Sequence, residues 1–270
     1  MTHVQTGTIL DDILARTAAD LAERKISMPV SDLEATARSL PAPLSLRAAL
    51  AARAMSVIAE IKRASPSRGV FQVPVDPAKV AIDYLAGGAA AISVLTDQPF
   101  FQGSLRDLDA AASVAHAHAN AVPVLRKDFV VDPYQIVEAR SHGADAVLLI
   151  VAALDDVALA ELLAASMAWE MDALVEVHDE SEMERAAAVG AKVVGINNRD
   201  LRSFAVDLSV SERLAPLAPD DAVVVAESGV FGPGDVERLH KAGAHAVLVG
   251  EGLVTAPDRA AAVKALLKWL

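Results

Sequence analysis

The sequence predicts an α/β protein, a single (β/α)8 TIM barrel with an N-terminal helical extension. After residue 55, short apolar runs rich in β-branched residues alternate with alanine-rich stretches of helical period, the pattern of parallel β/α construction. The starts of successive runs lie 20 to 34 residues apart, which accommodates one strand, one helix and two loops. The predicted strands cover residues 57–62, 91–95, 122–127, 146–151, 173–177, 193–197, 222–227 and 246–250.

A glycine repeat supports a closed barrel. The motif Gly-Ala-X-Ala/Val-Ile/Val joins a helical stretch to every second strand, at Gly88, Gly143, Gly190 and Gly243. We expect each glycine to end its helix in the left-handed conformation, which a Cβ disfavours. The spacings of 55, 47 and 53 residues each span about two β/α units. An open doubly wound sheet, the alternative fold, predicts no such regularity.

The barrel and its extension are predicted to form one domain over residues 1–270, with the extension at residues 1–55. A helix is expected from about residue 8 to 25, with Ile9, Ile13, Leu14 and Leu21 on one side. Prolines separate two further short helices. The extension either plugs the barrel floor or covers the site as a lid, and the apolar pattern favours the plug.

Composition excludes several classes of function. The chain has 24 Lys+Arg against 36 Asp+Glu, a formal net charge of −12, which opposes non-specific binding to nucleic acid or anionic lipid. Without cysteine there are no disulfides, thiol nucleophiles or Cys-ligated metals. The longest apolar stretch, residues 144–154, is too short to cross a bilayer, and the N-terminus lacks signal-peptide features. We expect a soluble, cytoplasmic monomer with no nucleic-acid or membrane partner.

Ionisable residues stand at the carboxyl ends of the odd-numbered predicted strands. They are Glu60, Lys62, Lys127, Glu176 and Glu227. Because side chains alternate between the faces of a strand, these charges are expected to point into the barrel mouth, where barrel enzymes build their sites. The alternative is a set of structural ion pairs inside the barrel. Charges gathered at one end of a barrel favour the functional interpretation.

Glycine-containing turns follow three predicted strands, at residues 65–69, 227–229 and 250–252. Backbone N–H groups of the loops after strands seven and eight commonly hold a phosphate in barrels, so the expected partner is a small phosphate ester. His116 and His118 point in different directions on a helix and form a poor metal pair. His178 follows Glu176 by two residues, so facing the site is the alternative to the structural hydrogen bond that we expect for it. The site residues therefore predict acid–base chemistry without a metal.

Several motifs resemble the indole-3-glycerol-phosphate synthase family, beginning with residues 57–69, V-I-A-E-I-K-R-A-S-P-S-R-G. The resemblance extends to S-V-L-T at 93–96, F-Q-G-S at 101–104, L-R-K-D-F at 125–129, L-V-E-V-H at 174–178, G-I-N-N-R-D-L at 195–201, A-E-S-G at 226–229 and V-G at 249–250. It implies conversion of 1-(2-carboxyphenylamino)-1-deoxyribulose 5-phosphate to indole-3-glycerol phosphate, with loss of carbon dioxide and water. It implies neither a metal nor an organic cofactor.

The resemblance also implies roles for individual residues. Lys127 would be the acid at the ribulose carbonyl, and Lys62 would orient the substrate carboxylate or hydroxyls. Glu176 and Glu60 are candidates for the dehydration step. The division of acid and base among Lys62, Lys127 and Glu176 stays open. The implied catalytic set is Glu60, Lys62, Lys127, Glu176, Asn197 and Glu227, with Asn197 and Glu227 holding hydroxyls.

By the same resemblance, Ser65, Arg199, Ser228, Gly229 and Gly250 would bind the phosphate. The set enclosing the anthranilate ring would be Phe101, Phe129, Leu148 and Leu201, for which core packing is the alternative. Glu251 departs from the family pattern, since many members carry Ser or Thr there. Its carboxylate would repel phosphate, so we expect the side chain to turn away. The resemblance also favours a lid for residues 1–55.

Two other functions stay open. A different phosphate-binding barrel, such as phosphoribosylanthranilate isomerase, needs one acid and one base, whereas this mouth offers two lysines and three glutamates. A non-catalytic ligand-binding barrel is possible because fold does not fix function. It predicts that one of the charged strand ends is missing, and none is.

Overall fold

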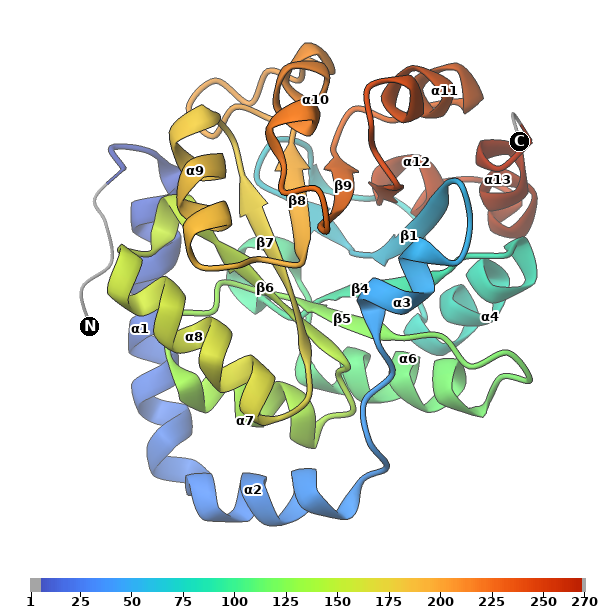
Figure 1. Ribbon diagram of the computed structural model, residues 1–270. Helices are drawn as coiled ribbons and strands as arrows, with labels where there is room; N and C mark the ends of the chain where they lie inside the picture. Colours follow the sequence, from blue (N-terminus) through green and yellow to red (C-terminus); the bar gives the residue numbers. More distant parts are fainter. Residues whose placement is uncertain (1–5, 269–270) are drawn as a thin grey trace.

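Eight parallel strands form a closed barrel in the computed structural model, which describes residues 6–268 (Figure 1). Neighbouring strands pair in parallel around the ring, and the first closes against the last. The strands are β1 (Ser56–Ile61), β4 (Ala91–Leu95), β5 (Val124–Lys127), β6 (Ala146–Ile150), β7 (Asp172–Val177), β8 (Val193–Asn197), β9 (Val223–Glu227) and β10 (Ala246–Val249). The predicted TIM barrel is confirmed, with strand ends within two residues of expectation.

Helices surround the barrel and bury the outer faces of the strands (Figure 1). Most begin at an aspartate or serine whose side chain accepts a hydrogen bond from the first turn, as Asp76 and Ser104 do. They are α4 (Pro77–Gly87), α5 (Gln98–Phe101), α6 (Leu105–Ala117), α7 (Pro133–Ser141), α8 (Asp156–Ala168), α9 (Glu180–Ala188), α10 (Ser209–Leu214), α11 (Pro233–Lys241), α12 (Glu251–Val254) and α13 (Arg259–Leu266), with 3-10 turns η1 (Val151–Ala153) and η2 (Ala215–Leu217). None of the helices in the described part of the chain is long and apolar enough to cross a membrane.

The four repeated glycines lie where helices turn into strands. Their φ angles are 91° at Gly88, 80° at Gly143, 81° at Gly190 and 105° at Gly243. All four are in the left-handed region, so the prediction that glycine ends these helices is confirmed.

Three helices precede the barrel, as predicted: α1 (Ile9–Ser27), α2 (Val30–Ser39) and α3 (Leu46–Ala51). The buried side of α1 contains Leu10, Ile13, Leu14 and Leu21, whereas Ile9 is only partly buried. In Figure 1, α1 runs down the side of the barrel to α2, and α3 returns to the strands. The ends of the predicted domain, residues 1–5 and 269–270, lie outside the described residues.

The sequence posed plug and lid as alternatives for the extension, whereas in the structure it contacts both ends of the barrel. Helix α3 contacts β1, β4 and β9, and Ser56 at the start of β1 donates to the carbonyl of Leu50, so α3 covers the barrel floor. At the other end, Ile9 and Ile13 in the first turns of α1 line the cavity at the barrel mouth. One segment therefore touches both ends of the barrel.

Helix α1 is fixed to the barrel by charged groups. Arg24 Nη1 lies 2.7 Å from Oε2 of Glu138 on α7, and that oxygen also accepts from Nη1 of Arg126 at 2.9 Å. Arg126 is part of β5, and its side chain is fully buried. Its Nη2 lies 2.8 Å from Oδ2 of Asp128. This network joins the extension to the strand that carries Lys127.

A two-stranded hairpin lies over the mouth between β1 and α4. It consists of β2 (Ala64–Ser65) and β3 (Gly69–Val70), paired antiparallel. Residues 65–69 were predicted to form a glycine-containing turn without strands. Two residues per strand give no periodic signal, so the hairpin could not be predicted.

Candidate active site

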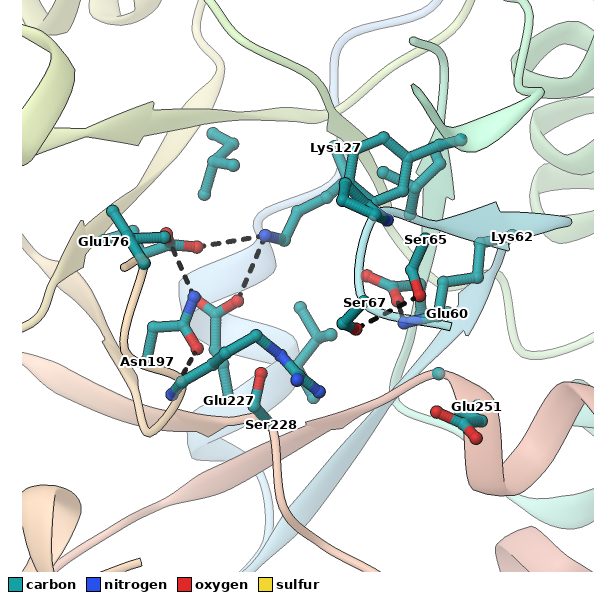
Figure 2. A pocket seen from close by; sticks show the side chains of 18 of the residues that line it. Glu60, Lys62, Ser65, Ser67, Lys127, Glu176, Asn197, Glu227, Ser228 and Glu251 are labelled. Carbon is teal, nitrogen blue, oxygen red and sulfur yellow. Dashed lines mark hydrogen bonds and ion pairs between the residues drawn. The ribbon is translucent and has the colours of Figure 1, made fainter. Parts of the chain in front are cut away.

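One cavity at the carboxyl ends of the strands gathers every residue of the predicted catalytic and substrate-binding sets (Figure 2). The three loops that the sequence predicted to surround the mouth all contribute to it. Its lining includes Glu60, Lys62, Ser65, Phe101, Lys127, Phe129, Leu148, Glu176, Asn197, Arg199, Leu201, Glu227, Ser228, Gly229 and Gly250.

Lys127 lies at the centre of the charged cluster. Its Nζ is 3.0 Å from Oε2 of Glu176 and 3.2 Å from Oε2 of Glu227, so it bridges two carboxylates from different strands (Figure 2). Asn197 Nδ2 donates to Oε1 of Glu176 at 3.3 Å. Both glutamate side chains are only 3% exposed. The three charges thus face one another largely out of solvent.

A second ion pair lies across the cavity. Lys62 Nζ is 2.8 Å from Oε1 of Glu60, two residues earlier on the same strand face. Gly250 packs against this pair, and a Cβ there would lie 2.7 Å from Lys62 Nζ and overlap Glu60 Oε1. Residue 250 must therefore be glycine for the pair to keep its position.

The two carboxylates that share Lys127 have different proton affinities. Burial raises the pKa of Glu227 to about 8, and Lys127 offsets this only in part because Glu176 and Glu60 lie near. Burial acts on Glu176 in the same direction, but Lys127, His178 and the Asn197 amide lower its pKa to about 2. The surroundings therefore favour the ionised form of Glu176 and the neutral form of Glu227. This is the separation expected of a base beside an acid.

Lys127 keeps its proton in this environment. Burial would lower its pKa, but Glu176, Glu227 and Glu60 together raise it above the usual value.

Oε1 of Glu227 is buried and forms no hydrogen bond to the residues that the structure describes. It faces Gly195 on β8, where a Cβ would overlap it. In a protonated Glu227 this oxygen can carry the proton, since no described residue donates a hydrogen bond to it.

The loops after β1, β8, β9 and β10 form the polar end of the cavity. Ser228 and Gly229 have φ angles of 65° and 84°, so two successive residues after β9 are left-handed. Ser228 is one of few non-glycine residues with a positive φ in the described chain, a strain typical of binding sites. Arg199 comes from the loop after β8, and its Nη1 donates to the carbonyl of Phe204. Ser65 and Ser67 face this end from the hairpin (Figure 2).

The opposite side of the cavity is apolar. The rings of Phe101 and Phe129 lie 6.2 Å apart at an interplanar angle of 39°. Leu148 and Leu201 complete this wall, and Ile13 contributes from α1. A flat aromatic group fits between such surfaces.

Some lining residues were missed from the sequence. Ser67 lay inside a recognised motif, and its hydroxyl beside Ser65 was a usable signal. Phe204 and Phe231 lie in loops and carry no periodic signal, although Phe231 is 73% exposed at the rim. Ile9 was expected on the buried side of α1, not in the cavity.

Glu251 lies at the rim of the cavity, where its Oε1 is 3.3 Å from Nε of Arg68. The hairpin brings Arg68 within ion-pair distance of α12. The prediction that the Glu251 side chain turns away from a bound phosphate stays a prediction. Burial lowers the pKa of Arg199, and the Glu251 charge opposes that shift.

The described residues contain no group of three or more His, Asp or Glu side chains arranged to hold a metal ion. His116 pairs with Asp145, 2.7 Å away. This histidine lies outside the cavity lining.

Comparisons with known proteins agree with one another. Residues 10–266 match the family model described as indole-3-glycerol phosphate synthase. The chain is 52% identical over 262 residues to proteins of that name from Mycobacterium tuberculosis (strain H37Rv) and Mycobacterium bovis (strain BCG / Pasteur 1173P2), covering 97% of this chain and 94% of each relative. It is 50% identical over 264 residues to one from Mycolicibacterium smegmatis, covering 98% and 95%.

Solved structures confirm the fold at lower identity. Thiamine phosphate pyrophosphorylase from Pyrococcus furiosus matches with a TM-score of 0.60 at 18% identity, over 83% of this chain and 96% of that one. A 3-hexulose-6-phosphate synthase matches with a TM-score of 0.59 at 21% identity, over 78% and 98%. At these identities the likeness shows a shared barrel and no more.

Proposed function

Because the chain belongs to the indole-3-glycerol phosphate synthase family, the decarboxylating lyases of tryptophan biosynthesis, we propose how its own residues divide the reaction. The observation that carries the proposal is Lys127 held between Glu176 and Glu227, whose surroundings favour the ionised form of Glu176 and the neutral form of Glu227. The substrate is 1-(2-carboxyphenylamino)-1-deoxyribulose 5-phosphate. Its aromatic ring lies against Phe101 and Phe129, and its phosphate lies at the polar end beside Ser228 and Arg199.

Lys127 acts in the first step. The ring carbon that carries the carboxylate attacks the ribulose carbonyl carbon, and Lys127 gives its proton to the carbonyl oxygen as the new C–C bond forms. The carboxylate then leaves as carbon dioxide, and its bonding electrons restore the aromatic ring. Lys62 and Glu60 orient the substrate opposite Lys127, because their ion pair faces it across the cavity.

Glu176 and Glu227 act in the dehydration. Glu227 holds the new hydroxyl and protonates it as it leaves as water, while Glu176 removes a proton from the adjacent ring carbon. Asn197 helps to hold the hydroxyl. Glu176 lies 3.0 Å from Lys127, so it can return its proton to that amine. Glu227 regains a proton from solvent, which matches the one proton consumed overall.

A fluorescence assay tests this proposal. The protein is mixed with the substrate in buffer containing EDTA, and indole fluorescence is followed for the wild type, Lys127→Met and Lys127→Arg. Removing a general acid is expected to slow turnover by roughly 10² to 10⁴-fold, and arginine restores charge but not the acid. A folded Lys127→Met protein with undiminished turnover would remove Lys127 from the mechanism.

Glu237→Gln is a suitable control because Glu237 pairs with Lys241 on the exposed surface, outside the cavity lining. If the wild type forms no product, the assigned substrate is wrong. An isomerase substrate is then the next to test.

We also propose that the enzyme acts as a cytoplasmic monomer on this small-molecule ester, without nucleic-acid or membrane partners. The net charge of −12 supports the absence of binding to anionic polymers and lipids. Light scattering coupled to size exclusion tests the state directly. A mass near 28.1 kDa is expected, and a dimer would contradict the proposal.

A further inference from the structure

We propose that His178 is a positioning residue for Glu176, held as an imidazolium between the carboxylates of Glu182 and Glu176. The inference rests on the proposed role of Glu176 as the base. His178 itself does not line the cavity. It therefore acts on the reaction through Glu176 and not on the substrate.

The local chain fixes the ring of His178. Glu182 on α9 accepts from the backbone N–H of His178 at 2.8 Å and lies 3.0 Å from its Nδ1, both through Oε2. Asp179, the N-cap of α9, in turn accepts from the backbone N–H of Glu182. His178 is only 14% exposed in its side chain. The position of the ring is thus set by a helix start packed against the end of β7.

The other ring nitrogen points at the proposed base. Nε2 of His178 lies 3.4 Å from Oε1 of Glu176, and this nitrogen is buried without a hydrogen bond to the described residues. Each ring nitrogen therefore faces a carboxylate oxygen.

Counting hydrogens indicates the protonation state. A neutral imidazole has one N–H, so one nitrogen would present a lone pair to a carboxylate oxygen in a buried site. A ring with two protons presents an N–H to each carboxylate instead. The geometry therefore favours an imidazolium when both glutamates are ionised.

The surrounding charges agree with this state. His178 is faced by Glu182 from α9 and Glu176 from β7, with Glu227 from β9 farther away. Lys127 is the opposing cation, on the other oxygen of Glu176. Burial lowers the pKa of His178, but Glu182, Glu176 and Glu227 together raise it above its usual value.

This arrangement explains why the two glutamates beside Lys127 differ. Lys127 donates to Oε2 of Glu176. Asn197 donates to Oε1 of the same carboxylate, and Nε2 of His178 faces that oxygen. Glu227 shares Lys127 but leaves its second oxygen without a partner in the described chain. A second cation at Glu176 therefore keeps it ionised and fixes the plane of the carboxylate for proton removal.

Nitrogen-15 NMR of the histidine-labelled enzyme tests the protonation state, with His178 assigned through correlations within its own residue. Both nitrogens are expected to show imidazolium shifts at pH 7 and to change together above that pH. A ring with one protonated nitrogen at pH 7 would overturn the proposal. This measurement uses the wild type and does not depend on a variant that folds.

Kinetics test the effect on Glu176. In His178→Gln and Glu182→Gln, the acid limb of kcat against pH is expected to rise by about one pH unit, because Glu176 becomes easier to protonate. Substrate KM is expected to change less than threefold, since His178 does not touch the cavity. His116→Gln, which breaks a His–Asp pair outside the cavity, should leave the limb in place.

Glu176→Gln separates the two proposals. If it abolishes turnover while the His178 and Glu182 variants keep the wild-type limb, Glu176 stays the base and His178 loses its positioning role. Full activity in Glu176→Gln instead removes the proposed base, and the NMR result then concerns the structure of the pair alone.

Discussion

Gly195 on β8 and Glu227 on β9 fit one another so closely that a single methyl group at residue 195 would overlap Oε1 of the carboxyl. The carboxyl is buried and bound to Lys127 by its other oxygen, so it has little room to move away. The absence of a Cβ at Gly195 on β8 thus leaves the space that the carboxyl of Glu227 on β9 occupies.

We expect Gly195→Ala to lower kcat by at least tenfold, because the methyl group must displace Glu227 or spread the strands. Gly234→Ala is the matched control, since no heavy atom lies within 4 Å of a Cβ there. Steady-state kinetics and thermal unfolding of both variants check this. Wild-type kcat in a folded Gly195→Ala protein would show that Glu227 tolerates displacement.

The raised pKa of Glu227 predicts an alkaline limb in the pH profile. The neutral carboxyl is the form that donates a proton, and it is lost as the pH rises through about 8. Wild-type kcat/KM is therefore expected to fall above that pH. Glu227→Gln is expected to lose roughly 10² to 10⁴-fold in kcat at pH 7 and to lack this limb. A wild-type limb retained in Glu227→Gln would assign it to another group.

Thermal stability at alkaline pH distinguishes the loss of activity caused by ionisation of Glu227 from a loss caused by unfolding. Because the pKa of Glu227 is raised in the folded state, the folded chain holds this proton more tightly than the unfolded chain. Between the ordinary carboxyl range and about pH 8, the unfolded chain has released this proton and the folded chain still holds it. The free energy of unfolding of the wild type therefore falls as the pH rises through this range. Glu227→Gln avoids that loss, so its Tm at pH 9 should equal or exceed that of the wild type.

Arg68 and Glu251 form an ion pair at the rim of the cavity. We therefore expect the site to bind phosphate more weakly than the same site without the Glu251 carboxylate would. The Glu251 carboxylate repels an incoming phosphate and occupies an arginine at the rim. Glu251→Gln is expected to lower the substrate KM by roughly threefold to tenfold, most strongly at low salt, with kcat unchanged. Inorganic phosphate should also inhibit this variant more strongly. A higher KM would mean that the pair is needed to hold the hairpin in place.

Most of the barrel and the lining of its cavity followed from local patterns. Glu60 and Lys62 were placed inward by alternation along an apolar strand, and the structure puts both in the cavity. Such patterns work because the period of a strand fixes the face of each side chain.

Arg126 shows where the same reasoning stops. It neighbours Lys127 and so points to the helix-covered side, yet it is fully buried there. Its partners Thr96 and Glu138 come from other elements, and Glu138 in turn pairs with Arg24. Its partner Asp128 lies only two residues away, but nothing in the sequence around residue 126 identifies the partners on other elements. The pairing of His178 with Glu182, by contrast, was within reach because the two lie four residues apart.

The Arg126 network predicts a difference in stability between its buried and exposed members. Glu138→Ala leaves the buried guanidinium of Arg126 with Asp128 as its remaining carboxylate, which is expected to cost about 3–5 kcal/mol of unfolding free energy. Arg24 is 29% exposed in its side chain, so Arg24→Ala should cost only about 1 kcal/mol. Arg16→Ala, which removes a pair between residues 16 and 20 on the surface of α1, should change the value by less than about 0.5 kcal/mol. Urea unfolding at pH 7 measures the free energy of unfolding of all three variants.

Equal losses for Glu138→Ala and Arg24→Ala would mean that the network mainly fixes α1 to the barrel and does little to compensate the buried charge of Arg126.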